Sequence, residues 1–415
     1  MISQDLIEHV NATMPFAIQT RRYLHENPEV SANEFNTSEY LKAECRKLGL
    51  SIENVSKDAI SAGTGFIAIF DTGIPGKILG LRTDIDALPI NENTENETRT
   101  RLVISHHPNV MHACGHDGHM ATLLSAMRIL ISRRRLKSGK LIFIFEEGEE
   151  ASTGIHAMIR LLKEKKIDAI YGQHLFSGLE TGQIALAEGP ITSSSLRIQM
   201  TIHGRGGHIS RPDLSVNPVI AAAYIVTNLA GAWVNQLPPE QLMTFGLSQI
   251  NGSPVRNVIP DKAYIGGSFR YHKDEVGEKA FRLIKEVSKS VAYAHKCSVS
   301  FSDDSGPSAR AVINKDPYLI KIGRESINLL FPRSLITDFR WGASESFGHY
   351  AKVCPSLFTL IGTKNEKVGS GAEHHSEYFD LDEKSLMFSI GLMVQIAETF
   401  LGDHFQMEKG DHDAK

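Results

Sequence analysis

Hydrophobic and polar residues follow two different spacings along this chain, and the spacing changes from one segment to the next. Apolar residues that recur every three or four positions predict a helix with one buried face. Strict alternation, or a short apolar run, predicts a strand. In the first part of the chain these rules predict helices over residues 6–24, 37–48, 119–131 and 153–163, and strands over residues 63–70, 77–81, 140–145 and 169–174. Strands that alternate with helices are typical of an α/β sheet with helices on its faces.

The pattern changes near Gly189. From there it predicts strands over residues 196–203, 242–250, 263–271 and 298–301, and helices over residues 218–233 and 276–295. Two helices on a four-stranded antiparallel sheet make a small α+β domain. Beyond residue 312 the first pattern returns, with helices over residues 317–330 and 385–400. We therefore expect an α/β domain formed by residues 1–188 and 306–415, with a smaller α+β domain of residues 189–305 inserted in it.

Composition supports a soluble protein of about two domains and narrows its partners. The chain has 415 residues, of which 41% are hydrophobic and 22% charged. A net charge of −4 without a basic stripe argues against nucleic acid as a partner. The first residues include Asp5, Glu8 and His9, which predicts an amphipathic helix and not a signal peptide, and no stretch approaches the roughly 20 apolar residues of a membrane helix. Four widely spaced cysteines form no disulfide framework, so we expect a cytoplasmic protein.

Residues 111–119, Met-His-Ala-Cys-Gly-His-Asp-Gly-His, carry the strongest chemical signal in the chain. Three histidines, one cysteine and one aspartate fall within nine positions. Thiolate, imidazole and carboxylate are the side chains that hold zinc and related divalent metals. The alternative is a polar loop without a ligand, but buried polar groups need partners, and a cation would be that partner.

Further acidic and imidazole residues lie at the ends of predicted strands or near the C-terminus. They are Glu146, Glu147, Glu149 and Glu150; His174; Asp84 and Asp86; and His374 and His375. Each group alone has an ordinary explanation, because paired glutamates usually form a solvated face and a histidine at a strand end is often structural. Ligands of open α/β sheets, however, bind beyond the strand ends. Together with residues 111–119, these groups favour a metal site.

Several collinear motifs resemble the metallopeptidase M20 family, in its amidohydrolase branch of hippurate hydrolases, N-acyl-amino-acid deacylases and indole-acetyl-amino-acid hydrolases. The most specific is His-Ala-Cys-Gly-His-Asp at residues 112–117. The other matching segments are Arg21-Arg22-Tyr23-Leu24-His25 with Pro28-Glu29, Arg82-Thr83-Asp84-Ile85-Asp86-Ala87-Leu88-Pro89, Glu149-Glu150, Gly204-Arg205-Gly206-Gly207-His208, Asn257-Val258-Ile259-Pro260-Asp261 and His375-Ser376. The resemblance runs nearly from end to end and implies a mixed-sheet catalytic domain.

The resemblance also implies a site with two divalent metal ions, which would be zinc, manganese, cobalt or nickel. The implied ligands are Cys114, His116, Glu150, His174 and His375. His375 is preferred over His374 because it directly precedes Ser376, as the ligand histidine of the family does. Glu149 would be the general base, and Asp84 would hold a ligand in place by a hydrogen bond. Asp117 we interpret as structural.

These roles suit the hydrolysis of an amide, which is a poor electrophile. Two cations can polarise the carbonyl group and lower the pKa of bound water from 15.7 to about 7. Glu149 would take a proton from that water and pass it to the leaving amine. Cys114 must bind as a thiolate, so metal affinity should fall at acid pH.

The inserted domain would supply the remaining residues. By resemblance, His208 stabilises the oxyanion, often in the site of the other subunit of a homodimer formed through this domain. Its ordinary explanation is an exposed histidine in a hairpin turn. Asn257 and Arg270 match positions that hold the carbonyl and carboxylate groups of the substrate, and an arginine fork suits a carboxylate. The alternative for Arg270 is a surface salt bridge. Gly342 lies where the family brings backbone to the substrate.

Two departures from the family pattern bear on the site. The family usually has Gln-Pro-Ala before its glutamate pair, where this chain has Glu146-Glu147-Gly148. Two additional acids near the metals would alter metal preference or repel an anionic substrate, unless they point away. The family often has Glu-Asp-Phe where this chain has Glu345-Ser346-Phe347, so a hydrogen bond near the substrate is in question.

We therefore predict a metal-dependent amidohydrolase that acts on small N-acyl amino acids. The first alternative is a carboxypeptidase or dipeptidase that uses the same two-metal site. The second is a binding protein on the same scaffold, which would be expected to lack Glu149 or a ligand. The third is a cysteine hydrolase that uses Cys114 and His116, although a nucleophile usually meets a base from elsewhere in the fold.

Overall fold

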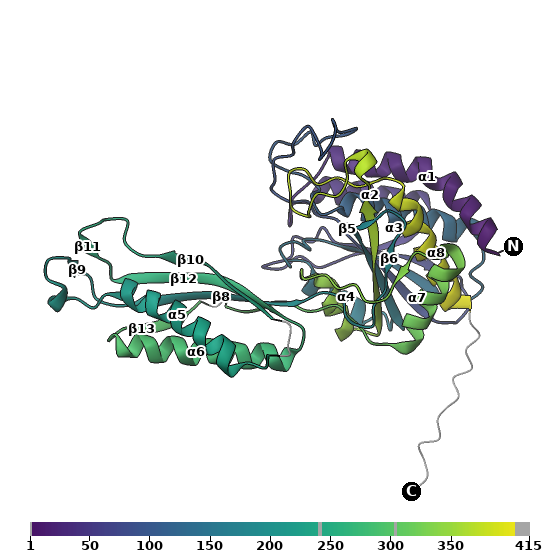
Figure 1. Cartoon of the computed structure of the whole chain (residues 1–415). Coiled ribbons are helices and arrows are strands. Elements are labelled where there is room, and N and C mark those ends of the chain that lie inside the picture. Colours follow the sequence, from purple (N-terminus) through teal and green to yellow (C-terminus); the bar gives the residue numbers. More distant parts are fainter. Residues whose placement is uncertain (1, 240–242, 303–304, 403–415) are drawn as a thin grey trace, which may run out of the picture. The chain divides into compact units, whose positions relative to one another are not determined.

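The computed structural model describes residues 2–239, 243–302 and 305–402. Residue 242 of one expected strand and residues 403–415 of the expected catalytic domain lie outside this range. The chain divides into two compact units (Figure 1). The first unit comprises Met1–Gly189, Asn314–Phe339 and His349–Lys415, and the second comprises Pro190–Ile313 and Arg340–Gly348.

The first unit is built on an eight-stranded mixed sheet with the order β1-β2-β4-β3-β5-β17-β6-β16. The strands are β1 (Ser51–Asn54), β2 (Phe66–Asp71), β3 (Ile78–Asp84), β4 (Lys140–Glu146), β5 (Ala169–Glu180), β6 (Ile184–Ala185), β16 (Leu335–Ile336) and β17 (Ser356–Lys364). The central strands β4, β3, β5 and β17 are mutually parallel. Their carboxyl ends therefore meet at one edge of the sheet, which is where open α/β sheets bind ligands.

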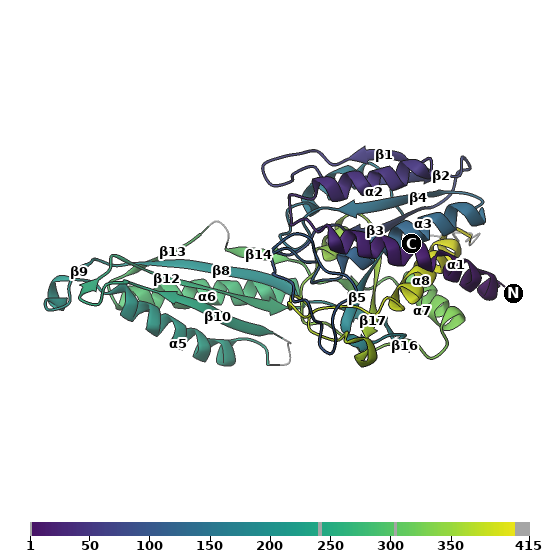
Figure 2. The ribbon, with the colours of Figure 1, turned by 90° about the horizontal axis from the view of Figure 1, so that it is seen from above.

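Helices cover both faces of this sheet. They are α1 (Ile2–Glu26), α2 (Phe35–Lys47), α3 (His116–Arg133), α4 (Ile155–Lys163), α7 (Pro317–Leu330) and α8 (Ser385–Gly402), with the short 3-10 helix η3 (Glu366–Val368). A second 3-10 helix, η2 (Ser346–Lys352), begins in the second unit and ends in the first. Helices α1, α3, α7 and α8 pack together, and α2 lies along β1 and β2 (Figure 2). The crossovers β3–α3–β4 and β4–α4–β5 run in opposite directions across the sheet. Because parallel crossovers are right-handed, α3 and α4 lie on opposite faces.

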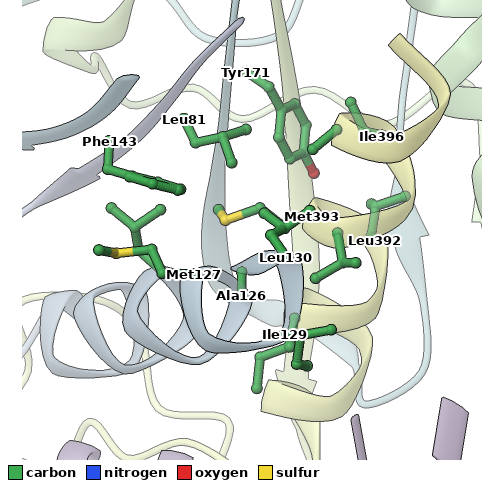
Figure 3. Close-up of a cluster of buried hydrophobic side chains, with 14 of the residues drawn as sticks. Leu81, Ala126, Met127, Ile129, Leu130, Phe143, Tyr171, Leu392, Met393 and Ile396 are labelled. Carbon is green, nitrogen blue, oxygen red and sulfur yellow. The ribbon is translucent and has the colours of Figure 1, made fainter. Parts of the chain in front are cut away.

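The core of the first unit lies between the sheet and the helices α3 and α8. Figure 3 shows Met127 and Leu130 of α3 beside Met393 of α8, facing Leu81 and Phe143 of the sheet. These side chains are almost completely buried. Burial of a side chain of this size contributes roughly 1.5–3 kcal/mol, so the contact fixes α3 firmly against the sheet. The first turn of α3 is thereby held at the carboxyl edge.

The second unit is a five-stranded antiparallel sheet with two helices. Its strands are β8 (Ser194–His203), β10 (Thr244–Asn251), β12 (Lys262–Tyr271), β13 (Ser298–Phe301) and β14 (Gly306–Ala309), and its helices are α5 (Pro218–Gln236) and α6 (Asp274–Ala294). A two-stranded ribbon of β9 (Gly207–His208) and β11 (Val258–Ile259) adjoins the 3-10 helix η1 (Pro212–Leu214). Strands β7 (Gly189–Pro190) and β15 (Ile313–Asn314) lie where the chain passes between the units.

All eight expected helices are confirmed within two or three residues at most ends, and so are the eight expected strands, among the described residues. The expected four-stranded sheet of the second unit has a fifth strand, because β14 pairs with β8. For the same reason the chain returns to the first unit at Asn314 and not at residue 306. Strand β17, in the middle of the first sheet, was not expected.

Two helices are long and apolar enough to cross a membrane by length and composition alone, α5 and α8. This differs from the expectation from the sequence that no stretch is long and apolar enough to do so. In α8, 72% of the relevant residues are buried in the first unit, as expected of a core helix, whereas in α5 only 28% are buried.

Candidate metal centre

The predicted metal ligands of the first unit gather at the carboxyl edge of its sheet. Asp84 and Glu146 end the paired strands β3 and β4 opposite one another. His174 was expected to end its strand, but β5 continues to Glu180. The pairing of β5 with β3 nevertheless ends at Gly172, so His174 stands beyond the last rung of that ladder. The edge therefore carries carboxylates and an imidazole side by side.

Cys114 and His116 are placed by a sharp turn at the start of α3. Gly115, between them, has a φ of +84°, a conformation that favours glycine. His116 then begins the helix. The side chains on either side of Gly115 are both buried, and both face the cluster at the edge of the sheet.

The structure brings the five predicted ligands together. Potential ligand atoms of Cys114, His116 and His174 lie within 4.8 Å of one another, and so do those of Cys114, Glu150 and His375. Cys114 Sγ is 3.5 Å from His174 Nε2. Glu150 approaches two histidines, with Oε1 3.8 Å from His116 Nε2 and Oε2 3.3 Å from His375 Nε2. Cys114 is therefore shared between two overlapping groups of donors.

Hydrogen bonds set the tautomers of two of these histidines. His116 Nδ1 donates to the backbone oxygen of Asp86 at 2.9 Å. His174 Nδ1 donates to the backbone oxygen of Leu175 at 2.7 Å. In the neutral imidazole, which is the form that binds a metal, the single proton is therefore on Nδ1, and each Nε2 has a lone pair available to the cluster. An outer hydrogen bond that fixes the inner nitrogen is the usual arrangement of a metal-binding histidine.

The same reasoning separates two other buried histidines from the ligand set. His119 Nδ1 donates to Asp84 Oδ1 at 2.7 Å, and its Nε2 accepts the backbone N–H of Leu175 at 2.9 Å. His374 Nε2 accepts the backbone N–H of Ser177 at 3.2 Å, so its remaining nitrogen carries the proton. Neither residue has a lone pair left for a metal. The contacts thus favour His375 over His374 as a ligand.

The cluster fits a bound cation. His116 Nε2 and Glu150 Oε1 are buried and have no hydrogen-bond partner among the described residues, although unpartnered buried groups are costly. Burial lowers the pKa of His116, but Asp84, Asp86 and Glu150 outweigh it and raise that pKa to about 10. The site therefore favours positive charge. A divalent metal ion would supply that charge and the missing partner of both atoms.

Asp86 contacts two of the predicted ligands from outside the cluster. From the sequence, this supporting role is expected of Asp84. Asp86 Oδ1 lies 3.2 Å from His116 Nδ1, and its Oδ2 accepts the backbone N–H of Glu150 at 3.1 Å. Asp84 Oδ1 instead accepts from His119 and is 3.7 Å from His116 Nδ1. One aspartate therefore positions two of the predicted ligands directly.

Asp117 has the structural role that the sequence suggested. Its Oδ2 accepts hydrogen bonds from Arg21 Nε at 2.7 Å and from His25 Nδ1 at 2.8 Å. The charge of Arg21 and the bond from His25 outweigh burial and lower the pKa of Asp117. These contacts tie α1 to the start of α3. The motif at residues 21–25 therefore has a structural role, which is to connect these two helices.

The two acids that depart from the family pattern are each held by other groups. Glu146 Oε2 accepts from Arg82 Nε at 2.8 Å and from the hydroxyl of Tyr350 at 2.7 Å. Glu147 Oε2 accepts from Thr64 Oγ1 and from the backbone N–H of Gly65, both at 2.7 Å. Glu147 thus points toward residues 61–65 and away from the cluster. At the other departure, Glu345 Oε1 accepts the backbone N–H of Phe347.

Glu34 is hydrogen-bonded to the turn that carries Glu149. Its Oε1 accepts the backbone N–H of Gly148 at 2.8 Å, and its Oε2 lies 2.9 Å from Thr64 Oγ1. Thr64 has one hydroxyl proton and cannot donate it to both Glu34 and Glu147. Burial, with the nearby charge of Asp86, raises the pKa of Glu34 from 4.5 to about 7. A protonated Glu34 supplies the second proton.

This pKa predicts a pH-dependent stability. Because the folded protein binds the Glu34 proton more tightly than the unfolded chain, its free energy of unfolding falls as pH rises from about 4.5 to about 7. We expect Glu34→Gln, which cannot ionise, to remove this decline and to stabilise the protein above neutral pH by up to about 3 kcal/mol. Urea denaturation at about pH 5 and about pH 8 measures the effect. Equal pH dependence in variant and wild type would contradict it.

The other predicted residues lie in the second unit. His208, on β9, is exposed, and its Nδ1 is 2.8 Å from Ser210 Oγ. Asn257 is nearby, because its backbone oxygen accepts the N–H of Ile209 at 3.2 Å. The glycine-rich segment pairs with β11, so His208 is opposite Val258. One end of the second unit therefore carries both His208 and Asn257.

Arg270 and Gly342 lie elsewhere in the second unit. Arg270 is the penultimate residue of β12, opposite Ser195, and its Nη1 donates to Ser344 Oγ. Burial lowers the pKa of Arg270, and in the described part of the chain it forms no salt bridge, contrary to the alternative explanation. Gly342 is exposed, and a side chain there would meet no atom within 4 Å. Within the described residues, the guanidinium group of Arg270 therefore has no acidic partner.

The contacts of Cys114 do not suit a cysteine nucleophile paired with His116. Across the described residues, Cys114 Sγ makes its hydrogen-bond contacts with His174 and His374, and none joins it to His116. Burial, followed by Glu150 and Glu149, raises the pKa of the Cys114 thiol well above its usual range. Without a metal, Cys114 is therefore a poor nucleophile.

Comparison with known proteins gives one family over most of the chain. The sequence profile described as Peptidase family M20/M25/M40 matches residues 80–399. A solved structure from Bacillus subtilis, described as a dinuclear metal binding peptidase from M20 family, is similar with a TM-score of 0.78 and 26% identity, over 94% of this chain and 99% of that one.

Curated relatives include enzymes of two kinds. The chain is 31% identical to IAA-amino acid hydrolase ILR1-like 5 of Arabidopsis thaliana, over 92% of this chain and 86% of that protein. It is also 31% identical to thermostable carboxypeptidase 1 of Saccharolobus solfataricus, over 92% and 95% of the two. N-acetyl-L-cysteine deacetylase of Bacillus subtilis is 28% identical, over 95% and 90%.

Proposed function

This chain belongs to the peptidase family M20/M25/M40, as its motifs predicted, and from that premise we propose that it hydrolyses N-acyl amino acids to a carboxylic acid and a free amino acid. The observation that carries the proposal is the cluster at the edge of the first sheet. There His116 Nε2 and Glu150 Oε1, which have no hydrogen-bond partner among the described residues, lie beside Glu149. Relatives named as an IAA-amino acid hydrolase and a deacetylase support the reaction type.

Two divalent ions per chain are our proposal for the cofactor, with zinc, manganese, cobalt and nickel as candidates. The residues that would hold them are Cys114, His116, Glu150, His174 and His375. When bound, such ions polarise the amide carbonyl and lower the pKa of water. Cys114 belongs to both groups of donors that the structure brings together, and Glu150 of the second group lies 3.8 Å from His116 of the first, which suits two neighbouring ions.

Glu149 is placed to handle the proton of the reaction. It lies in the turn after β4, about nine-tenths buried, with a carboxylate oxygen within 4.8 Å of ligand atoms of His116 and Glu150. We assign it the role of general base toward the attacking water and then of general acid toward the leaving amine. Glu150 beside it serves as a ligand, so one of the two adjacent glutamates transfers protons and the other binds metal.

Arg270 is our candidate for the carboxylate of the amino-acid product. Its guanidinium is half-buried at the end of β12, with a hydroxyl group and no described acid as its partner. A guanidinium offers two parallel N–H groups to a carboxylate. We assign Asn257 to the substrate carbonyl and His208 to the oxyanion.

The dimensions of the second unit support a homodimer. Arg270 pairs with Ser195 near one end of β8, whereas His208 and Asn257 lie past His203 at the other end. Eight residues of strand, at about 3.3 Å each, put about 26 Å between these ends. A molecule the size of a dipeptide spans about 7 Å. If Arg270 and His208 contact the same substrate, they belong to different chains.

The second unit also offers a surface for that homodimer. Helix α5 contains no charged residue, and Ile220, Tyr224 and Val234 are exposed along it. Strand β10, against which α5 packs, is an edge strand of the sheet. Exposed apolar patches and open strand edges are both surfaces that natural proteins cover. We propose that a second copy of this chain covers this surface.

We propose the cytoplasm as the location of the protein, since all four cysteines are free thiols.

A substrate panel distinguishes the proposal from its rival, a carboxypeptidase or dipeptidase, which the relative named thermostable carboxypeptidase 1 favours. We expect the purified protein with manganese or zinc to release amino acids from N-acyl amino acids faster than from dipeptides. A chelator should abolish the release, and added metal should restore it. Faster cleavage of dipeptides would favour the rival, and release that survives the chelator would contradict both.

A further inference from the structure

His374 is buried against the metal cluster but is not one of the proposed ligands. Its side chain is 8% exposed. The Nδ1 atom lies 3.7 Å from Cys114 Sγ, within hydrogen-bond range for sulfur. The Nε2 atom accepts the backbone N–H of Ser177 at 3.2 Å. The His374 ring thus connects the backbone of Ser177, in β5, to the sulfur of Cys114, a proposed ligand.

These contacts fix the position of the ring proton. A ring nitrogen that accepts a hydrogen bond carries no proton, so the bond from Ser177 to Nε2 makes His374 a neutral imidazole. A neutral imidazole has one proton, and Nε2 cannot hold it while it accepts from Ser177. The proton is therefore on Nδ1, the nitrogen that faces Cys114 Sγ. A protonated nitrogen donates to sulfur and does not accept from it.

Neighbouring rings hold His374 in this orientation. Phe176 stacks on it, with ring centroids 5.5 Å apart and planes 16° apart. Phe379 packs against it at 5.0 Å. Gly178 makes room for Phe176, because a Cβ at that position would lie 2.5 Å from Phe176 Cε1. The ring is therefore a rigid donor whose direction does not depend on solvent.

We propose that His374 is a positioning residue that donates a hydrogen bond from Nδ1 to the sulfur of Cys114 and so weakens electron donation from this thiolate to a bound metal. The inference rests on the proposed metal site, since it needs Cys114 as a ligand. Hydrogen bonds to a ligand sulfur draw charge from it and are a known means of tuning thiolate-bound metals. The effect is electronic, and a residue that merely filled space would not produce it.

Cobalt provides a direct readout, because a thiolate bound to Co²⁺ gives a charge-transfer band in the near ultraviolet. We expect this band in the cobalt-loaded wild-type protein. In His374→Phe, which keeps a flat ring but has no donor, the sulfur donates more strongly, and the band should move to longer wavelength. In His374→Asn the side-chain nitrogen occupies the place of Nδ1, and the band should stay near the wild-type position. His374→Gln, whose amide reaches the place of Nε2 instead, is the matched control and should shift like His374→Phe.

The outcomes separate this inference from the proposed function. A band that does not move in His374→Phe and His374→Gln would overturn the hydrogen bond while leaving Cys114 as a ligand. Absence of the band from the wild-type protein would overturn both. If His374→Phe does not fold, the comparison of His374→Asn with His374→Gln decides, since equal bands in these two variants would contradict the proposal.

Discussion

Replacement of Glu149 by glutamine is expected to lower kcat by about 10²- to 10⁴-fold, while the protein keeps its bound metal. The amide of glutamine has nearly the shape of the carboxylate but cannot take a proton from water. The proposed ligands all remain, because Glu149 is not one of them. Metal content of the purified variant and its rate of hydrolysis at saturating substrate are the two measurements.

Glu147→Gln is the matched control for this experiment. It makes the same chemical change two residues away, in a side chain whose oxygens accept from Ser61, Gly63, Thr64 and Gly65. We expect this control to lose stability, because it loses buried hydrogen bonds, but to keep its kcat within about twofold. A fully active Glu149→Gln variant would show that another group is the base. Loss of metal from it would place Glu149 among the ligands.

Two inactive variants are expected to restore each other if His208 acts in the site of a second chain. His208→Ala and Glu149→Gln should each be nearly inactive alone. When equal amounts are unfolded and refolded together, random pairing makes half of the dimers mixed. Each mixed dimer contains one site with both wild-type residues. The mixture should therefore recover about one quarter of wild-type activity, because half of the dimers have one of their two sites intact.

A mixture that stays inactive would place His208 in the site of its own chain or outside catalysis. The rate of each variant refolded alone is the baseline. Refolded wild-type protein gives the scale for recovery, and size-exclusion chromatography shows whether dimers formed. Recovery in a preparation that is entirely monomeric would contradict the shared site.

The cluster could be predicted because most of its residues are close in sequence or follow strands. Cys114 and His116 are separated by a single glycine, and Glu149 and Glu150 are neighbours after β4. Strand β17 was missed because Leu357-Phe358-Thr359-Leu360-Ile361 is a short apolar run without a helical or alternating period. Such a run is typical of a strand buried on both faces but does not distinguish it from a buried helix segment.

The finer roles needed three-dimensional contacts. Asp84 and Asp86 would share one face if β3 continued, but β3 ends at Asp84, and Asp86 reaches His116 from beyond the sheet. Sequence likewise did not show which histidines have a lone pair for metal. That depends on backbone groups such as the oxygen of Leu175 and the N–H of Ser177, whose positions no side-chain pattern encodes.

The pairing of β8 with β12 means that the distance between Arg270 and His208 can change only in steps. They pair without interruption from Lys262 and His203 to Tyr271 and Ser194. Deleting one residue from each strand would turn the side chains beyond it to the opposite face, since neighbours along a strand point to opposite sides. Only changes of two residues keep the faces, and each moves the ends by about 7 Å. The reach of this unit can therefore change only in steps as long as a dipeptide, so gradual adjustment to a new substrate has to come from other residues.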